Sequence, residues 1–174
     1  MVRPVDLPPR PARDADAPAL PADVRAVLEG VADPEVPVLS VIDLGIVRGV
    51  RREGATLVVT ITPTYVGCPA TAVIGFDVAR ALDAAGLGPV RVEQALAPAW
   101  TTDWMSPAGR EKLRAYGIAP PGAKACGADP DEPPACPRCA STDTARISAF
   151  GSTACKALWR CNACLEPFDQ FKCI

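Results

Sequence analysis

Histidine is absent from this chain of 174 residues. Catalysis by Ser-His-Asp or Cys-His groups is therefore excluded, because both need an imidazole. A zinc hydrolase that binds its metal through imidazole ligands is excluded for the same reason. The chain also lacks a Gly-x-Gly-x-x-Gly fingerprint, so it shows no sign of a dinucleotide site. Any metal site must use thiolates, carboxylates or water.

An excess of basic residues is missing as well. The chain has 18 Lys and Arg against 20 Asp and Glu, a net charge of −2, so we expect no nucleic-acid partner. No run approaches the roughly 18 apolar residues of a membrane span. The first residues contain no apolar stretch of signal-peptide length. We therefore expect a protein of the cytoplasm without membrane contact. Thiols stay reduced in that compartment.

Cysteine, by contrast, is abundant, with eight residues in the chain. Four of them form the pairs CPRC at 136–139 and CNAC at 161–164, separated by 21 residues. A two-residue spacer lets a tight turn aim both sulfurs at one tetrahedral centre. The predicted ligands of a structural zinc ion are Cys136, Cys139, Cys161 and Cys164. A single iron ion has the same ligands, as in rubredoxin, and a pair of disulfides is the alternative that the reducing compartment disfavours.

Proline-rich stretches divide the chain. Residues 1–20 predict a disordered tail, and residues 119–135, which include Cys126, predict a linker. Between them lies a predicted domain over residues 21–118, and after them a zinc domain over residues 136–174. About 40 residues supply too small a core alone, so the second domain needs the metal to fold.

The order of elements in the first domain is α-β-β-α-β. A helical pattern with Asp23 as the expected N-cap opens it, and the loop DPEVPVLSVIDLG follows. Next come the strands IVRGVRR and TLVVTIT, the helix PATAVIGFDVARALDAAG and the strand VRVEQAL. A hairpin is antiparallel and a β-α-β step is a parallel crossover. We therefore predict an α/β (α+β) fold with a small mixed sheet and helices packed on it.

Further details follow from the periodicity. The long helix should end at Gly86, and a last helix, SPAGREKLRAYG, should run from an N-cap at Ser106 to Gly117. RISAF and ACKALWR fit a β-ribbon around the zinc. The expected buried stripe of the long helix consists of Val73, Ile74, Val78, Ala81, Leu82 and Ala85.

Cys68 stands between Gly67 and Pro69, just before the long helix. Unpaired backbone N–H groups and the positive end of the helix dipole favour a thiolate there, which could bind a soft metal or attack an electrophile. A buried, inert thiol is the equally weighted alternative. Asp33 and Glu35 form an acidic pair in a Pro-rich loop. They are either solvated charges at a helix end or oxygen ligands and acid/base partners for Cys68.

Cys155 and Cys173 flank the second zinc pair. Alternation along the strands puts Cys155 with Trp159 and Cys173 with Phe171, which indicates packing, and a second metal site is the alternative. From residue 136 onward five basic and three acidic residues give only +2, too little for a phosphate backbone. A protein contact is the favoured use of this domain, with Trp159, Phe168 and Phe171 as expected anchors.

Four stretches together resemble the D subunits of bacterial phenylacetyl-CoA epoxidase systems. They are DPEVPVLSVIDLG, TPTYVGCPA, WTTDWMSPAGREKLRAYGIAPP and FGSTACKALWRCNACLEPFDQFKC. The likeness is colinear over about residues 22–174. The first domain alone resembles a wider family of iron–sulfur assembly factors, and the second resembles the zinc ribbon of these D subunits.

The resemblance implies a non-catalytic accessory subunit of the phenylacetyl-CoA 1,2-epoxidase system in aerobic phenylacetate catabolism. Such a subunit aids maturation of an iron–sulfur or di-iron centre, or assembly of the complex. Transient iron or a cluster would be held by Cys68 with Asp33 and Glu35, and Cys155 and Cys173 are secondary candidates. The expected partners are other epoxidase subunits, the reductase or a second copy of the chain. A purely structural scaffold subunit and, less favoured, a thiol-dependent enzyme are the alternatives.

Overall fold

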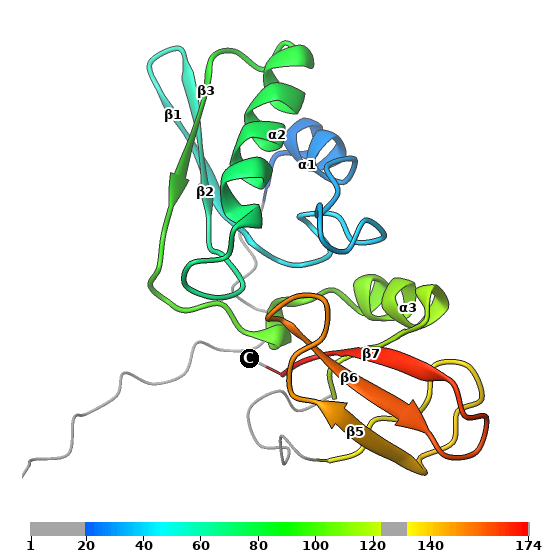
Figure 1. Ribbon diagram of the computed structural model, residues 1–174. Coiled ribbons are helices and arrows are strands. Elements are labelled where there is room, and N and C mark those ends of the chain that lie inside the picture. Colours follow the sequence, from blue (N-terminus) through cyan, green and yellow to red (C-terminus); the bar gives the residue numbers. More distant parts are fainter. Residues whose placement is uncertain (1–19, 123–131, 174) are drawn as a thin grey trace, which may run out of the picture.

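The computed structural model describes residues 20–122 and 132–173 (Figure 1). The predicted tail, apart from Leu20, and the part of the predicted linker that contains Cys126 lie outside these residues. The described chain forms two units, each built on its own sheet, with α3 (Pro107–Tyr116) beside the second one. The mixed α/β class expected from the sequence is confirmed.

The first sheet has the order β1-β2-β3. Strands β1 (Val47–Glu53) and β2 (Thr56–Ile61) pair antiparallel, and β2 pairs parallel with β3 (Val90–Gln94). The helix α2 (Ala70–Ala84) makes the parallel crossover and packs on the sheet, and α1 (Ala22–Leu28) packs beside α2 (Figure 1). The predicted mixed sheet is therefore present, with β2 as its central strand.

The buried stripe of α2 is narrower than the sequence predicts. Its buried residues are Ala70, Ile74, Val78 and Leu82, at a strict spacing of four. Val73 is 48% exposed and Ala85 is also exposed, so the prediction was wrong for these two. A three-stranded sheet covers only one line of side chains on the helix. Phe76, on the open face, is 67% exposed.

The predicted capping residues are confirmed for α3, whereas the predicted N-cap of α1 is wrong. Ser106 accepts a hydrogen bond from the Gly109 N–H at 2.9 Å, and Gly117 ends α3 with φ of 93°, as predicted. Asp23 is not the N-cap of α1, because Pro21 occupies that position without a side-chain cap. Asp23 already lies in the first turn, where its carboxylate accepts the N–H of Val24.

The second sheet has the order β4-β7-β6-β5. Strands β5 (Thr144–Ser148), β6 (Lys156–Cys161) and β7 (Pro167–Phe171) form an antiparallel meander, and β4 (Ile118–Ala119) pairs parallel with β7. The predicted β-ribbon corresponds to β5 and β6. Strand β4 was not foreseen, and β7 ends at Phe171, within the stretch to which strand alternation was applied. Because β4 directly follows α3, the chain enters the second sheet at the position where the linker was expected to begin.

The two units share a hydrophobic core. Phe171 of β7 is 1% exposed and packs among the buried residues of the first unit, with its ring centroid 6.2 Å from that of Trp100. The indole N–H of Trp100 donates to the carbonyl of Leu44 at 2.9 Å. The ribbon is thus packed against the first unit rather than merely tethered to it.

A buried carboxylate fixes α3 against the loop before β1. Asp43 accepts hydrogen bonds from the Ser40 hydroxyl at 2.9 Å, from the Ser106 hydroxyl at 3.1 Å and from the Lys112 ammonium at 2.6 Å. Burial alone would raise the pKa of Asp43, but the bonds from Lys112 and Ser40 outweigh it and hold the pKa below its ordinary value. The carboxylate is therefore stabilised in its charged form.

Gly45 shows why glycine ends this loop. Its φ is +67°, and a Cβ atom there would lie 2.2 Å from the carbonyl oxygen of Trp104. No other residue fits this close approach of two backbone segments.

Candidate metal and thiol sites

The four predicted zinc ligands converge at one end of the second sheet. The sulfurs of Cys136, Cys139, Cys161 and Cys164 all lie within 4.8 Å of one another. Cys136 and Cys139 come from the turn before β5. Cys161 ends β6, and Cys164 lies in the turn that leads to β7. The spacing of the two Cys-x-x-Cys pairs thus correctly predicted a compact four-sulfur cluster.

Both turns have the same backbone geometry. The N–H of Cys136 donates to the carbonyl of Ser141 at 2.9 Å, and that of Cys161 donates to the carbonyl of Glu166 at 3.0 Å. The residue just after each second cysteine is left-handed, Ala140 with φ of 62° and Leu165 with φ of 66°. These are the positive-φ residues other than glycine in the described chain. The left-handed residues were not predicted, because neither is a glycine or asparagine.

The cluster fits a tetrahedral thiolate-bound metal. With metal–sulfur bonds of about 2.3 Å, the sulfurs of a tetrahedral zinc site lie about 3.8 Å apart. The separations here are 3.8 Å for Cys136 and Cys164 and 3.5 Å for Cys139 and Cys161. A disulfide would need about 2.05 Å, and all four cysteines are free.

The pKa values of the cysteines in the cluster also indicate a bound cation. The backbone N–H of Cys164 lowers the pKa of Cys161 to about 7. For Cys164 the N–H of Glu166 acts in the same direction, but burial and the three other sulfurs outweigh it and raise the pKa to about 12. Thiolates this close repel one another, so all four can ionise together only around a metal ion.

Cys68 lies in the loop between β2 and α2, half-buried, with Pro69 as the N-cap residue of the helix. Its N–H donates to the carbonyl of Tyr65 at 3.3 Å, and its carbonyl accepts the N–H of Thr71 at 3.2 Å. These bonds hold the thiol at the start of α2, where the sequence placed it.

The two carboxylates of the acidic loop, Asp33 and Glu35, differ in burial. Asp33 is 8% exposed, and one of its oxygens accepts the N–H groups of Glu35 at 2.8 Å and Val36 at 2.7 Å. Burial raises the pKa of Asp33 even though these bonds oppose it. Glu35 is half-buried, and burial followed by the charge of Asp33 raises its pKa. Asp33 therefore shapes the loop, and Glu35 is the better placed oxygen donor.

The Tyr65 phenol, in the same loop as Cys68, has a strongly perturbed pKa. Desolvation, a hydrogen bond with Cys68 and the charges of Cys68, Glu35 and Cys155 raise the pKa of Tyr65 to about 12. Tyr65 was missed from the sequence, although it precedes Cys68 by only three residues in TPTYVGC.

The two remaining cysteines of the ribbon differ. Cys155 lies in the turn before β6, so it does not share the strand face of Trp159 as predicted. It is 4% exposed in the core of the first unit. Cys173 is exposed, and its sulfur lies 3.8 Å from the Thr102 hydroxyl. Cys155 thus belongs to the hydrophobic cluster against which Cys68 packs, whereas Cys173 lies at the surface.

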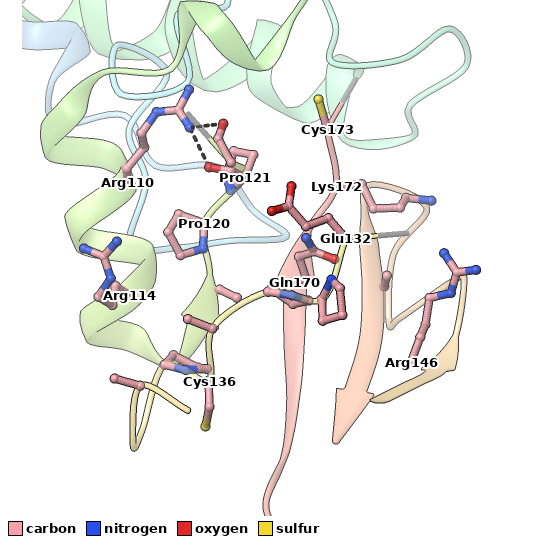
Figure 2. Close-up of a pocket in the computed structure, with 18 of the residues that line it drawn as sticks. Arg110, Arg114, Pro120, Pro121, Glu132, Cys136, Arg146, Gln170, Lys172 and Cys173 are labelled. Carbon is pink, nitrogen blue, oxygen red and sulfur yellow. Dashed lines mark hydrogen bonds between the residues drawn. The ribbon is translucent and has the colours of Figure 1, made fainter. Parts of the chain in front are cut away.

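The expected contact anchors are buried. Trp159, Phe168 and Phe171 are 3%, 4% and 1% exposed, so they cannot bind a partner from the surface. The ribbon instead presents a groove of ≈ 1270 Å³ between α3 and the second sheet. Figure 2 shows Arg110 and Arg114 on one side of it and Lys172 and Arg146 on the other. Arg110 is held by the carbonyls of Pro121 and Gly122 at 2.8 and 3.3 Å.

Among the described residues, no helix has both the length and the apolar character to cross a lipid bilayer.

Residues 21–95 match the family model of the iron–sulfur cluster assembly proteins, and residues 120–172 match that of the PaaD zinc beta ribbon domain. These matches and the four-sulfur cluster thus define an iron–sulfur assembly-type domain joined to a zinc ribbon. A protein of Escherichia coli (strain K12), named "Putative 1,2-phenylacetyl-CoA epoxidase" and designated its D subunit, is 52% identical over 158 residues, which are 91% of this chain and 96% of that protein. This chain belongs to the family of phenylacetyl-CoA epoxidase D subunits, as the sequence resemblance indicated.

Solved structures with similarity include a domain of unknown function from Bacillus anthracis. It is 31% identical with a TM-score of 0.47, over 52% of this chain and 87% of that one. A conserved hypothetical protein from Thermotoga maritima is 34% identical with a TM-score of 0.45, over 52% of this chain and 90% of that one. A Mycobacterium tuberculosis protein associated with Fe–S complex assembly and repair is 36% identical with a TM-score of 0.35, over 55% of this chain and 84% of that one.

Proposed function

We propose that this protein is a non-catalytic accessory subunit of the phenylacetyl-CoA 1,2-epoxidase system, acting in the cytoplasm in aerobic phenylacetate catabolism. It aids maturation of an iron–sulfur or di-iron centre, or assembly of the complex. The observation that supports this most is the half-buried Cys68 thiol at the start of α2, on a domain that matches iron–sulfur cluster assembly proteins. The client proteins are other epoxidase subunits or the reductase. The protein acts on them as a monomer or as a homo-oligomer.

The two thiol sites suit different tasks. In the part of the chain that the structure describes, the ribbon quartet is the one group with three or more ligand atoms within 4.8 Å. Four thiolates close the shell around zinc and stabilise the fold. Cys68 has fewer donors around it, and a metal with few protein ligands exchanges more readily. Cys68 therefore holds the cargo, Glu35 offers an oxygen ligand and Asp33 shapes the loop.

A purely structural scaffold is the second candidate, because the core shared by the two units and the basic groove between α3 and the ribbon suit a subunit that only holds others together. A thiol enzyme is less favoured. Catalysis by Cys68 needs a base, and the phenol of Tyr65, whose pKa is raised to about 12, is a poor one at neutral pH.

The test is metal analysis of protein purified without oxygen, together with epoxidase activity in cells. Wild type, Cys68→Ser and the matched control Cys173→Ser, which removes an exposed thiol, are compared for zinc, iron and acid-labile sulfide per chain. We expect one zinc in all three, with iron and epoxidase activity lost only in Cys68→Ser. Full activity of Cys68→Ser, with the complex still co-purifying, would instead favour the scaffold.

A further inference from the structure

We propose that the basic groove between α3 and the second sheet binds an extended, acidic segment of a client protein. The inference rests on the proposed accessory function and names the surface that recognises the client. It does not depend on metal binding by Cys68, because Cys68 does not line the groove.

The groove is positively charged on a chain that is negatively charged overall. Among the described residues, five basic and two acidic side chains line it, a net charge of +3, whereas the whole chain carries −2. The basic residues are Arg110, Arg114, Arg138, Arg146 and Lys172, and the acidic ones are Glu111 and Glu132. Positive charge is thus concentrated in the groove, which favours an anionic occupant.

Two of these cations are oriented by neutral partners. The guanidinium of Arg110 donates to the carbonyl of Thr102 at 2.7 Å, in addition to the two carbonyls described above. The Lys172 ammonium donates to the carbonyl of Ala149 at 3.3 Å and lies 4.4 Å from the ring centroid of Phe150. Carbonyls and an aromatic ring hold a cation in place without cancelling its net charge. Both cations therefore still attract the carboxylates of a ligand.

The first turn of the zinc quartet forms part of the groove wall. Cys136 and Cys139 line the groove together with Pro137 and Arg138, which lie between them. The bond from the Cys136 N–H to the carbonyl of Ser141 fixes the backbone of this turn. Arg138 is therefore carried on a rigid turn, which lowers the entropy that binding must remove.

The floor of the groove suits an extended peptide. Ala119, Gln170 and Ala157 lie in register on the neighbouring strands β4, β7 and β6, and all three line the groove. The two alanines leave room above the sheet. The amide of Gln170, between them, has a donor for a peptide carbonyl and an acceptor for a peptide N–H.

A small anion and a nucleic acid fit the groove less well. Its volume of ≈ 1270 Å³ exceeds the roughly 300–1,000 Å³ of small-molecule pockets. Figure 2 shows the cations on opposite sides of the groove rather than around one point. Single-stranded nucleic acid stacks its bases on aromatic side chains. Phe150 is the one aromatic residue among the described lining residues, and its ring already faces Lys172.

The experiment measures binding of a short, fluorescein-labelled peptide of alternating glutamate and proline to the zinc-loaded full chain by fluorescence anisotropy. Proline keeps the peptide extended, and a peptide with glutamine in place of glutamate is the control probe. The variants Arg138→Gln and Lys172→Gln and their combination are compared with Arg160→Gln. This control removes the same charge from β6 but does not line the groove. Zinc content and thermal unfolding are checked for each variant.

We expect the wild type to bind the glutamate peptide and not the glutamine peptide, with weaker binding as the ionic strength rises. Each single variant should weaken binding by up to about five-fold, the contribution of an exposed ion pair, and the double variant by about ten-fold. Arg160→Gln should match wild type. Wild-type affinity in the double variant, or an equal loss in Arg160→Gln, would overturn the inference. Tighter binding of an oligothymidylate of the same charge would also overturn it.

Cys173 gives a second readout on the wild-type chain. Its exposed thiol lines the groove, so the bound peptide should slow its alkylation, as read by mass spectrometry. Cys68 should react at the same rate with and without the peptide. Unchanged alkylation of Cys173 at saturating peptide would place the peptide elsewhere and refute the proposed site. Neither readout depends on iron at Cys68, so failure here is distinguishable from failure of the carrier function.

Discussion

Phe171 offers the sharpest test of how the two units are joined. It lies on the ribbon strand β7, yet its ring is 1% exposed in the core of the first unit and packs on Trp100. Phe168, three residues earlier, points to the opposite face of the same strand and belongs to the core around the zinc ligands. The two phenylalanines therefore form a matched pair on one strand, one for each core.

Truncation of a buried phenylalanine to alanine costs about 3–5 kcal/mol, through lost transfer energy and the cavity left behind. For Phe171→Ala we expect a loss of this size, which for a chain of this length lowers the melting temperature by about 6–20 °C. Zinc should stay bound, because the ribbon core around Phe168 is untouched. Phe168→Ala should instead speed the release of zinc.

The assay is urea denaturation followed by tryptophan fluorescence, with zinc release to a chelator measured in parallel under native conditions. Trp100 lies against Phe171, so its emission reports on the shared core. Two results would refute the reasoning. One is a cost below about 1 kcal/mol for Phe171→Ala, the level of a surface change. The other is zinc release in Phe171→Ala as fast as in Phe168→Ala.

Two further predictions concern the buried carboxylate and the metal. Because the pKa of Asp43 is depressed in the folded state, the stabilisation it provides is fully present above the unfolded value of about 3.9 and is lost as the pH falls through the folded pKa. The difference in unfolding free energy between wild type and Asp43→Asn should therefore be constant from about pH 5 to 7 and shrink below pH 4; a difference that grows on acidification would contradict this assignment. Cys161→Ser, or zinc removal by a chelator, should unfold the second sheet. The readout is loss of the near-ultraviolet circular dichroism signal of Trp159. A Cys139→Ala variant that keeps its zinc and its spectrum would show that the quartet is not the metal site.

Local sequence signals were enough to predict the helix ends, the first sheet and the cysteine cluster, because a single sequence pattern determines each of them. Ser106 and Gly117 mark the ends of α3, the hairpin and crossover define the first sheet, and two Cys-x-x-Cys pairs define the four-sulfur cluster. In each case the residues that carry the signal lie close together in the sequence or repeat a fixed spacing. The tertiary fold then has little freedom to override them.

The predictions of exposed residues were wrong where burial depends on how the two units pack against each other. Phe168 and Phe171 of β7 were expected to anchor a protein contact, because the ribbon carries too little positive charge to bind a phosphate backbone. The first unit covers one face and the zinc core covers the other, so Phe168 and Phe171 are both buried. The burial of Cys155 in the core of the first unit depends on this same docking. No spacing within the sequence encodes it.

Strand β6 has a further consequence. It starts directly after Cys155 and ends at Cys161, so six residues of one extended strand, about 20 Å long, connect a thiol buried in the core of the first unit to a ligand of the zinc quartet. An extended strand held on both sides by β5 and β7 is a stiff strut. Loss of zinc would free one end of this strand and loosen the packing of Cys155 at the other. Zinc in the ribbon would in that way also stabilise the core that the two units share.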